Sequence, residues 1–295
     1  MQEDAIPWAK PIKIANMHNP SRFWADWTTT DFQALALDRA IAILPVAATE
    51  QHGPHLPLSV DTDLVNGVVK AALPHLPADL PALFLPTQSV GLSPEHARFA
   101  GTLTLKPETV IRLWTELGES VYASGVRKLV LFNAHGGQVS VMDIVARDLR
   151  ARLGMLVYSV SWFNLPLHDA QGQDLNALFS AQEQRFGVHA GDVETSMMLA
   201  LRPGQVRMAH AQNFHSTSQD RAQEFAILGN GKTAKLGWQM QDYNPHGAAG
   251  NAAAATPEKG QALVDAAGRA LAQLLSEVDG LPMHTLTDAV APSRR

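Results

Sequence analysis

AIAILPVAA, residues 40–48, is a short and continuously apolar run, as expected for a strand buried on both faces. Apolar residues at helical spacing follow it, and three more strand-like runs then alternate with two further helical patterns. Such alternation favours parallel strands joined by right-handed crossovers. The sequence therefore predicts an α/β fold, a single-domain layered structure with a mostly parallel central sheet flanked by helices. The predicted strands cover 40–48, 82–87, 128–133 and 155–162, and the helices between them cover 63–73, 106–125 and 139–154.

Length and composition set the expected extent of this domain. With 295 residues, of which 46% are apolar, the chain can bury a full-sized core, so we expect one domain over residues 1–295. Helical patterns recur at 193–201 and at 256–278, where Thr256 fits the cap of a C-terminal helix. Residues 209–255 are rich in Gly, Asn, Gln and Ala and are predicted to form a long loop region.

Charge and cysteine content exclude several classes of function. The formal net charge is −5 and lysine and arginine form no cluster, so a nucleic-acid partner is not expected. No apolar run is long enough to span a bilayer, and the N-terminal MQEDAIPWAKPIKI lacks the order of a signal peptide, which favours a soluble, cytoplasmic protein. Because the chain has 0 cysteines, any bound metal must be held by His, Asp or Glu.

Metal-capable side chains gather where two of the predicted strands end. TEQHGPHLPLSVDTD, residues 49–63, follows the first strand and contains Glu50, His52 and Asp61. His135 lies in NAHGG, directly after the strand at 128–133. Because ligand sites in open parallel sheets form outside the carboxyl ends of the strands, we expect these side chains to lie close together.

Each of these motifs also has a purely structural interpretation. Asp61 or Asp63 could be a helix N-cap, and His135 could belong to an ordinary glycine-rich turn. Glu194 lies in HAGDVET, where acidic residues fit the first turn of a helix. As a set, however, they supply the nitrogen and oxygen ligands that a pair of Zn²⁺, Mn²⁺ or Fe²⁺ ions requires. The predicted metal ligands are Glu50, His52, Asp61, His135 and Glu194.

Four strings carry a resemblance to a known family. LPVAATEQHGPHLPLSVDTD, FAGTLTL, LFNAHGGQ and HAGDVETSMMLAL resemble, in the same order, the creatininase family of metal-dependent amidohydrolases. The resemblance covers roughly residues 40–260. It implies a layered α/β fold, assembly as a homohexamer, and two divalent ions per chain that hydrolyse a C–N bond in a small amide.

The resemblance also implies roles for individual residues. Glu50 and His135 would hold one ion, His52 the other, and Asp61 would bridge the two. In creatininase proper a tyrosine that contacts substrate and a glutamate ligand of the second ion follow the histidine, whereas this chain has Gly136 and Gly137. Glu194 is then the best remaining ligand for the second ion, and it is also a candidate base. Substrate contacts are implied for Ser93, Trp162 and Gly136, and proton transfer for His189, with His96 as a second candidate.

The chemistry that these residues imply is amide hydrolysis. A water that bridges two cations loses a proton near neutral pH and can attack an amide carbonyl, while His189 protonates the departing nitrogen. Gly136 and Gly137 leave the site more open, so we expect creatinine to be a poor substrate compared with a lactam, a formamide or a short peptide end. Two alternatives stay open: a dinuclear metal phosphoesterase, for which Arg98 is the only basic residue near the motifs, and a non-catalytic metal-binding assembly protein.

Overall fold

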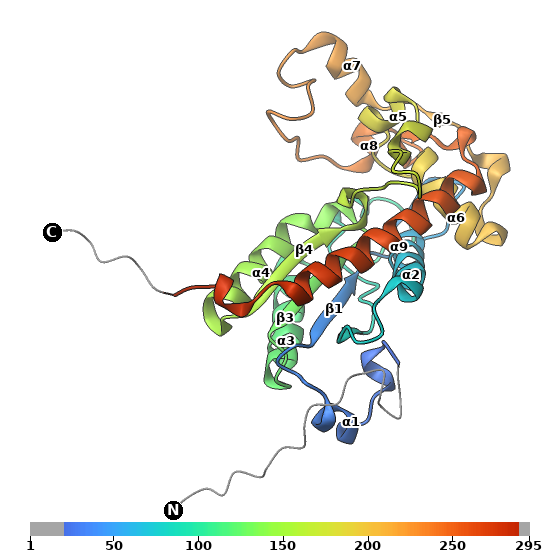
Figure 1. The fold of residues 1–295 in the computed structure, drawn as a ribbon. Helices are drawn as coiled ribbons and strands as arrows, with labels where there is room; N and C mark the ends of the chain where they lie inside the picture. The colour runs from blue at the N-terminus through green and yellow to red at the C-terminus, as the bar shows by residue number, and fades with distance from the viewer. Residues whose placement is uncertain (1–20, 289–295) are drawn as a thin grey trace, which may run out of the picture.

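The computed structural model describes residues 21–288 of the chain (Figure 1). The N-terminal segment MQEDAIPWAKPIKI, which is predicted not to be a signal peptide, lies outside the described residues. The extension of the domain to both ends, residues 1–295, therefore stays a prediction. Among residues 21–288, no helix combines the length and the apolar character needed to cross a membrane.

A four-stranded parallel sheet forms the centre of the molecule, as the sequence predicts. Its strands lie in the order β2-β1-β3-β4, so β1 and β3 are neighbours although helices α2 and α3 and strand β2 separate them along the chain. Val46 at the end of β1 pairs with Asn133 at the end of β3. The segments that follow these two strands therefore start side by side. The strand bounds are Ile41–Val46 (β1), Ala82–Phe84 (β2), Lys128–Asn133 (β3) and Leu156–Ser161 (β4).

Helices cover both faces of the sheet because successive strand side chains point to opposite sides. Ile41 and Ile43 of β1 pack into one apolar core, whereas Ala42 and Leu44 pack into the other. The first core is closed by α2, α6 and α9, the last of which is the long red helix in Figure 1. The second is closed by α3 and α4. These helices are α2 (Val60–Ala72), α3 (Pro107–Ala123), α4 (Val139–Leu153), α6 (Asp192–Leu201) and α9 (Pro257–Gly280).

Local signals in the sequence fix where several helices begin and end. Thr256 caps α9, since its side chain accepts a hydrogen bond from the Lys259 N–H at 3.3 Å. Gly154 ends α4 with a φ of 64°, a left-handed conformation that glycine adopts without strain. Helix α2 starts at Val60, three residues before the predicted start. This earlier start places Asp61 inside the first turn.

The prediction of a long loop region over 209–255 is wrong in part. This region contains two short helices and two short antiparallel strands, and its longest stretch without regular helices and strands is 225–239. Helix α7 buries no residue, so it has no apolar periodicity that a sequence reading could detect. Two further short helices, α1 and α5, were not predicted. These elements are α1 (Thr29–Ala34), α5 (Ala181–Phe186), β5 (Asn213–Phe214), α7 (Thr217–Glu224), α8 (Met240–Tyr243) and β6 (Gly250–Asn251).

Candidate metal centre

The five predicted metal ligands converge at the carboxyl edge of the sheet. Glu50 and His52 follow β1, and His135 follows β3, so strand pairing brings them together. Asp61 lies in the first turn of α2, and Glu194 lies in the first turn of α6. Three segments that are distant in sequence, 50–61, 135 and 194, thus supply one cluster.

Asp61 lies between the two histidines of this cluster. Its Oδ1 is 3.7 Å from His52 Nε2, and its Oδ2 is 3.5 Å from His135 Nδ1. The carboxylate is buried, with 1% of the residue exposed. The N-cap of α2 is Ser59, so the alternative that Asp61 caps this helix is wrong. One oxygen toward each histidine is the arrangement expected of a carboxylate that bridges two cations.

Glu50 faces the same His135 nitrogen as Asp61 does. Its Oε1 is 3.3 Å from His135 Nδ1, 3.3 Å from His96 Nε2 and 3.8 Å from His189 Nδ1. Its Oε2 accepts a short hydrogen bond from the Ser93 hydroxyl. Ser93 thus orients the Glu50 carboxylate in the folded chain.

Backbone carbonyl groups orient the ligand imidazoles. His52 Nδ1 donates to the Glu50 carbonyl at 3.1 Å, and His135 Nε2 donates to the Leu92 carbonyl at 3.0 Å. A carbonyl only accepts, so the proton of each neutral ring lies on the bonded nitrogen. The other nitrogen, His52 Nε2 or His135 Nδ1, then has a free lone pair that faces the carboxylates. Metal-binding histidines are generally held by such a second hydrogen bond.

Three atoms of this cluster are buried and lack a hydrogen-bond partner: Glu50 Oε1, His52 Nε2 and Asp61 Oδ2. Leaving a buried polar atom unpaired is costly, and native proteins rarely do so without a reason. All three atoms are metal-ligating types, and they belong to three of the five predicted ligands. The residues present therefore fit a divalent metal centre. Two divalent ions would nearly balance the charge of three carboxylates, those of Glu50, Asp61 and Glu194.

Glu194 is held at the edge of the cluster. Its Oε2 accepts a hydrogen bond from the Ala190 N–H at 2.5 Å and lies 4.0 Å from His52 Nε2. The start of α6 is itself anchored, because the buried Glu183 carboxylate accepts the Asp192 N–H at 2.7 Å. Ala190 has a φ of 53°, a strained conformation for a residue other than glycine. Together with His52 and His189, Glu194 forms a group whose ligand atoms all lie within 4.8 Å of one another.

The pKa values of the cluster indicate that added positive charge, as protons or cations, would stabilise it. Burial raises the pKa of Glu194 to about 7, and burial and the neighbouring Glu50 raise that of Asp61. Burial opposes protonation of His52, but contact with Asp61 outweighs it and raises the pKa of His52 to about 9. Burial also opposes ionisation of Glu50, but the charge of His135 holds its pKa below the usual range. Metal binding should therefore displace protons, so that affinity falls as the pH is lowered.

A cavity of about 980 Å³ opens above the cluster. Gly136, Trp162, His189 and Glu194, together with Glu50, Asp61 and His135, are among the residues that line it. Trp162 is 3% exposed, and its indole N–H has no hydrogen-bond partner. Ser93 is completely buried and is not among the residues that line the cavity, so its predicted contact with substrate stays a prediction. Its hydrogen bond to Glu50 instead favours a role in orienting that carboxylate.

Among the cavity residues that sequence reasoning missed, three have side chains that can contact a polar substrate. Glu95 and Trp238 line the cavity, as does Lys235, the only lysine or arginine among the described lining residues. Glu95 adjoins His96, a predicted candidate for proton transfer, so its position could have been inferred. Trp238 lies in the irregular segment 225–239, for which the sequence offers no periodicity.

Two further histidines, His55 and His246, lie in loops. His55 is buried, donates or accepts a 2.9 Å hydrogen bond with Thr195 Oγ1, and stacks on Phe214. His246 is exposed. Neither residue is among those lining the cavity.

Comparison with known proteins identifies the family. The family model for creatinine amidohydrolase matches residues 25–275, which is most of the chain. The chain belongs to the creatininase family. This confirms the resemblance inferred from the four sequence strings.

Two relatives of this creatininase-family protein have different names. A mycofactocin precursor peptide peptidase from Mycobacterium tuberculosis is 36% identical over 171 residues, which is 56% of this chain and 60% of the relative. The creatinine amidohydrolase of Pseudomonas putida is 30% identical over 197 residues, which is 63% of this chain and 74% of the relative. The chain thus spans less than two thirds of the peptidase that it matches.

Solved structures show the same fold. A Bacteroides fragilis protein, provisionally named a creatinine amidohydrolase, superposes with a TM-score of 0.70 at 25% identity, over 88% of this chain and 96% of that one. A manganese form of creatininase superposes with a TM-score of 0.66 at 24% identity, over 87% of this chain and 98% of that one. The likeness to the second establishes the fold alone.

Exchanging Asp61 for Asn tests its place between the histidines. Asn caps helices about as well as Asp, so a capping role would leave Asp61→Asn unaffected, whereas a bridging ligand needs its charge. We expect the wild-type melting temperature to rise by roughly 5–10 °C when Zn²⁺ is added at about 100 times its Kd, and Asp61→Asn to lose most of this rise.

The matched control is Asp63→Asn in the same helical turn. The Asp63 carboxylate accepts from Ser59 Oγ at 2.7 Å and pairs with Arg202 at 3.2 Å, away from the cluster. It should keep the full metal-dependent rise. If Asp61→Asn melts like Asp63→Asn at every Zn²⁺ concentration, Asp61 is not a ligand.

Two adjacent glycines provide a second test of the centre. A Cβ at Gly137 would lie 1.7 Å from Glu95 Oε1 and 2.5 Å from His135 Nε2, whereas a Cβ at Gly136 would meet nothing within 4 Å. Gly137→Ala should displace Glu95 and turn His135, and so weaken Zn²⁺ binding by about 10–100-fold, the usual cost of disturbing groups that orient metal ligands. Gly136→Ala should bind Zn²⁺ as the wild type does. Titration calorimetry would measure both affinities, and equal values would show that the packing at Gly137 does not matter for the centre.

Proposed function

We propose that this creatininase-family protein is a metal-dependent hydrolase that cleaves the C–N bond of an amide. The observation that carries the proposal is the convergence of buried, unpartnered ligand atoms of Glu50, His52 and Asp61 beneath a large cavity. One divalent ion would be held by Glu50, Asp61 and His135. A second would be held by His52, Asp61 and Glu194. The ions would be zinc, manganese or iron, in keeping with the nitrogen and oxygen ligands.

When bound, two such ions would acidify a water molecule and polarise the amide carbonyl. The chain's own residues would supply the remaining steps. His189 lines the cavity, and its Nδ1 faces Glu50 at 3.8 Å, so it is placed to take a proton from the attacking water and return it to the departing nitrogen. Glu194 lies on the same side and is the alternative base. Trp162, with its free indole N–H, would form a wall against the substrate.

The cavity supports a substrate larger than creatinine. Its volume of about 980 Å³ is at the upper end of the range for pockets that hold drug-sized ligands. Gly136 adds no side chain to its floor, where nothing lies within 4 Å of a Cβ. Among the predicted substrates, which are a lactam, a formamide and a short peptide end, the peptide end makes the most use of this space. The name of the Mycobacterium tuberculosis relative, a peptidase, is consistent with a peptide end.

The phosphoesterase alternative receives less support. Arg98 is exposed and does not line the cavity, where Lys235 is the only lysine or arginine among the described lining residues that could pair with a phosphate group. A cytoplasmic location and assembly as a homohexamer remain predictions from the sequence and its resemblance.

A substrate screen on Zn²⁺- or Mn²⁺-loaded protein tests the proposal. We expect hydrolysis of small amides, measured as released amine, that a chelator abolishes and added metal restores. For creatinine, kcat/KM should stay below about 10⁴ M⁻¹s⁻¹, the lower end of ordinary enzyme efficiency. Faster turnover of phosphate esters than of any amide would overturn the proposed reaction. A creatinine value above that threshold would overturn only the inference on substrate size.

A further inference from the structure

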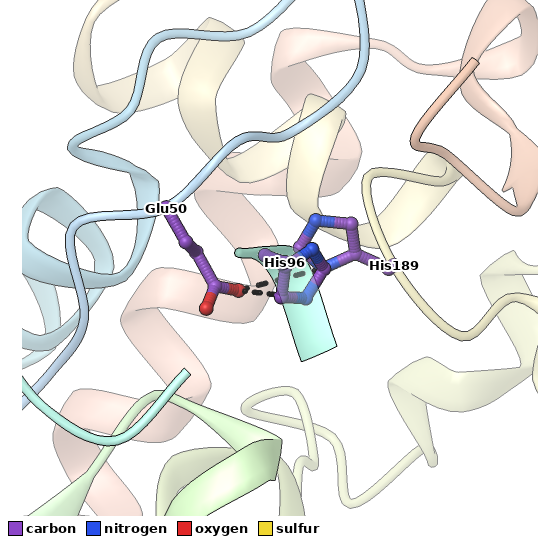
Figure 2. A group of neighbouring side chains, drawn as sticks. All are labelled: Glu50, His96 and His189. Atoms are coloured by element: carbon purple, nitrogen blue, oxygen red, sulfur yellow. Dashed lines mark ion pairs between the residues drawn. The ribbon is translucent and has the colours of Figure 1, made fainter. Parts of the chain in front are cut away.

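Three imidazoles form a stack beside the metal ligands. The ring of His189 lies between those of His52 and His96, with centroids 4.1 Å and 4.2 Å away and interplanar angles of 35° and 34°. His96 and His189 both approach the Glu50 carboxylate, as Figure 2 shows. The group of Glu50, His96 and His189 has the composition of a third metal site. The positions of the ring protons decide whether it is one.

Gln51 contacts both of the rings that face Glu50, those of His96 and His189. Its side-chain Oε1 accepts the Gly53 N–H at 3.0 Å, which leaves the amide NH₂ directed at His96 Nδ1, 2.7 Å away. If the amide were turned the other way, its NH₂ group would face the Gly53 N–H, and two hydrogen-bond donors would lie in contact. Gly247 leaves room for this side chain, since a Cβ there would lie 2.1 Å from Gln51 Oε1. The orientation of the Gln51 amide is therefore fixed on two sides.

The Gln51 amide determines the tautomer of His96. Because His96 Nδ1 accepts a hydrogen bond, the proton of the neutral ring lies on Nε2. That Nε2 is 3.3 Å from Glu50 Oε1, and His96 lines the cavity. His96 thus presents an N–H donor, and not a metal-ligating lone pair, beside Glu50 in the cavity wall.

The backbone carbonyl of the same residue determines the tautomer of His189. His189 Nε2 lies 2.7 Å from the Gln51 carbonyl oxygen, which only accepts, so Nε2 carries the proton. The Nδ1 atom then has a free lone pair, and it faces Glu50 Oε1 at 3.8 Å. Both rings carry their proton on Nε2, but His96 faces Glu50 with Nε2 whereas His189 faces it with Nδ1.

We infer that Gln51 is a positioning residue that makes His96 a hydrogen-bond donor and His189 a proton acceptor toward the same cavity. The inference rests on the proposed function. Water adds to the amide carbon while His189 Nδ1 takes its proton, and that proton passes to the nitrogen as the nitrogen leaves with the C–N electron pair. His96 Nε2–H donates to the carbonyl oxygen, on which negative charge develops in the transition state.

Nitrogen NMR of the Zn²⁺-loaded protein, labelled with ¹⁵N in histidine, tests this assignment without any substrate. Signals are assigned from their loss in His96→Phe and His189→Phe. We expect both rings to have a protonated Nε2 and an unprotonated Nδ1. A protonated Nδ1 on His96, or a zinc-dependent shift of its Nε2 that marks metal ligation, would overturn the inference.

Gln51→Met separates the side chain of Gln51 from its backbone. The His96 Nδ1 signal should move because it loses its hydrogen bond, whereas the His189 signals should not, since the backbone carbonyl remains. Gln88→Met, at a half-buried residue whose side chain donates to Pro86 and is not among those lining the cavity, should move neither. An unmoved His96 signal in Gln51→Met would contradict the positioning role.

Kinetics then test the donor role of His96. Removing one donor to a developing oxyanion typically costs about 10²–10³-fold in kcat, so His96→Phe should lose that much while it keeps its zinc content and its KM within a few-fold. A kcat within about threefold of the wild type would show that the His96 N–H is not used. If the wild type hydrolyses no amide, the proposed function fails, and the NMR result still decides the positions of the protons.

Discussion

The contact of the buried Asp61 carboxylate with His52 and His135 is the interaction on which the rest of the site depends. Asp61 is 1% exposed, and one of its oxygens lacks a hydrogen-bond partner. A buried carboxylate in this state is stable only with a cation or a proton nearby. The two histidines follow neighbouring strands of the sheet, and Asp61 lies in the first turn of helix α2, which packs on one face of the sheet. The fold therefore concentrates ligand atoms at one point, and cations would satisfy them there.

Much of this arrangement could be predicted from the sequence, because it follows from strand order. The apolar runs that became β1 and β3 predicted a parallel sheet, and pairing of Val46 with Asn133 brings TEQHG beside NAHGG. The pattern also placed Asp61 near a helix start. It left open whether this carboxylate caps the helix. If α2 began only two residues later, Asp61 would be its N-cap and not a buried residue of the first turn.

The sequence could not predict the contacts between side chains that belong to different loops. Ser93 has the residue type of a substrate contact, but its position beneath Glu50 depends on how two loops pack. Glu95 reaches His135, at 3.3 Å, only because Gly137 has no side chain. Gly137 was expected to leave the site open, whereas the Glu95 carboxylate fills the space beside it. Trp238 comes from a segment without periodicity, so no pattern could place it in the cavity.

The ligand cluster and the cavity walls of this creatininase-family protein come from different parts of the fold. The ligand cluster depends on the sheet and on two helix starts, whereas the cavity walls come from loops and from residues such as Gly136, Trp162 and Lys235. A change in the walls can alter which amide enters without changing how the C–N bond is cleaved. The proposed reaction therefore depends on the cluster, and the proposed substrate depends on the loops.

The most direct test of the central claim is anomalous diffraction from crystals grown with Mn²⁺. Two anomalous peaks are predicted, one among Glu50, Asp61 and His135 and one among His52, Asp61 and Glu194, with Asp61 in contact with both. A single peak, no peak, or a peak among Glu50, His96 and His189 would contradict the claim that Asp61 bridges two ions.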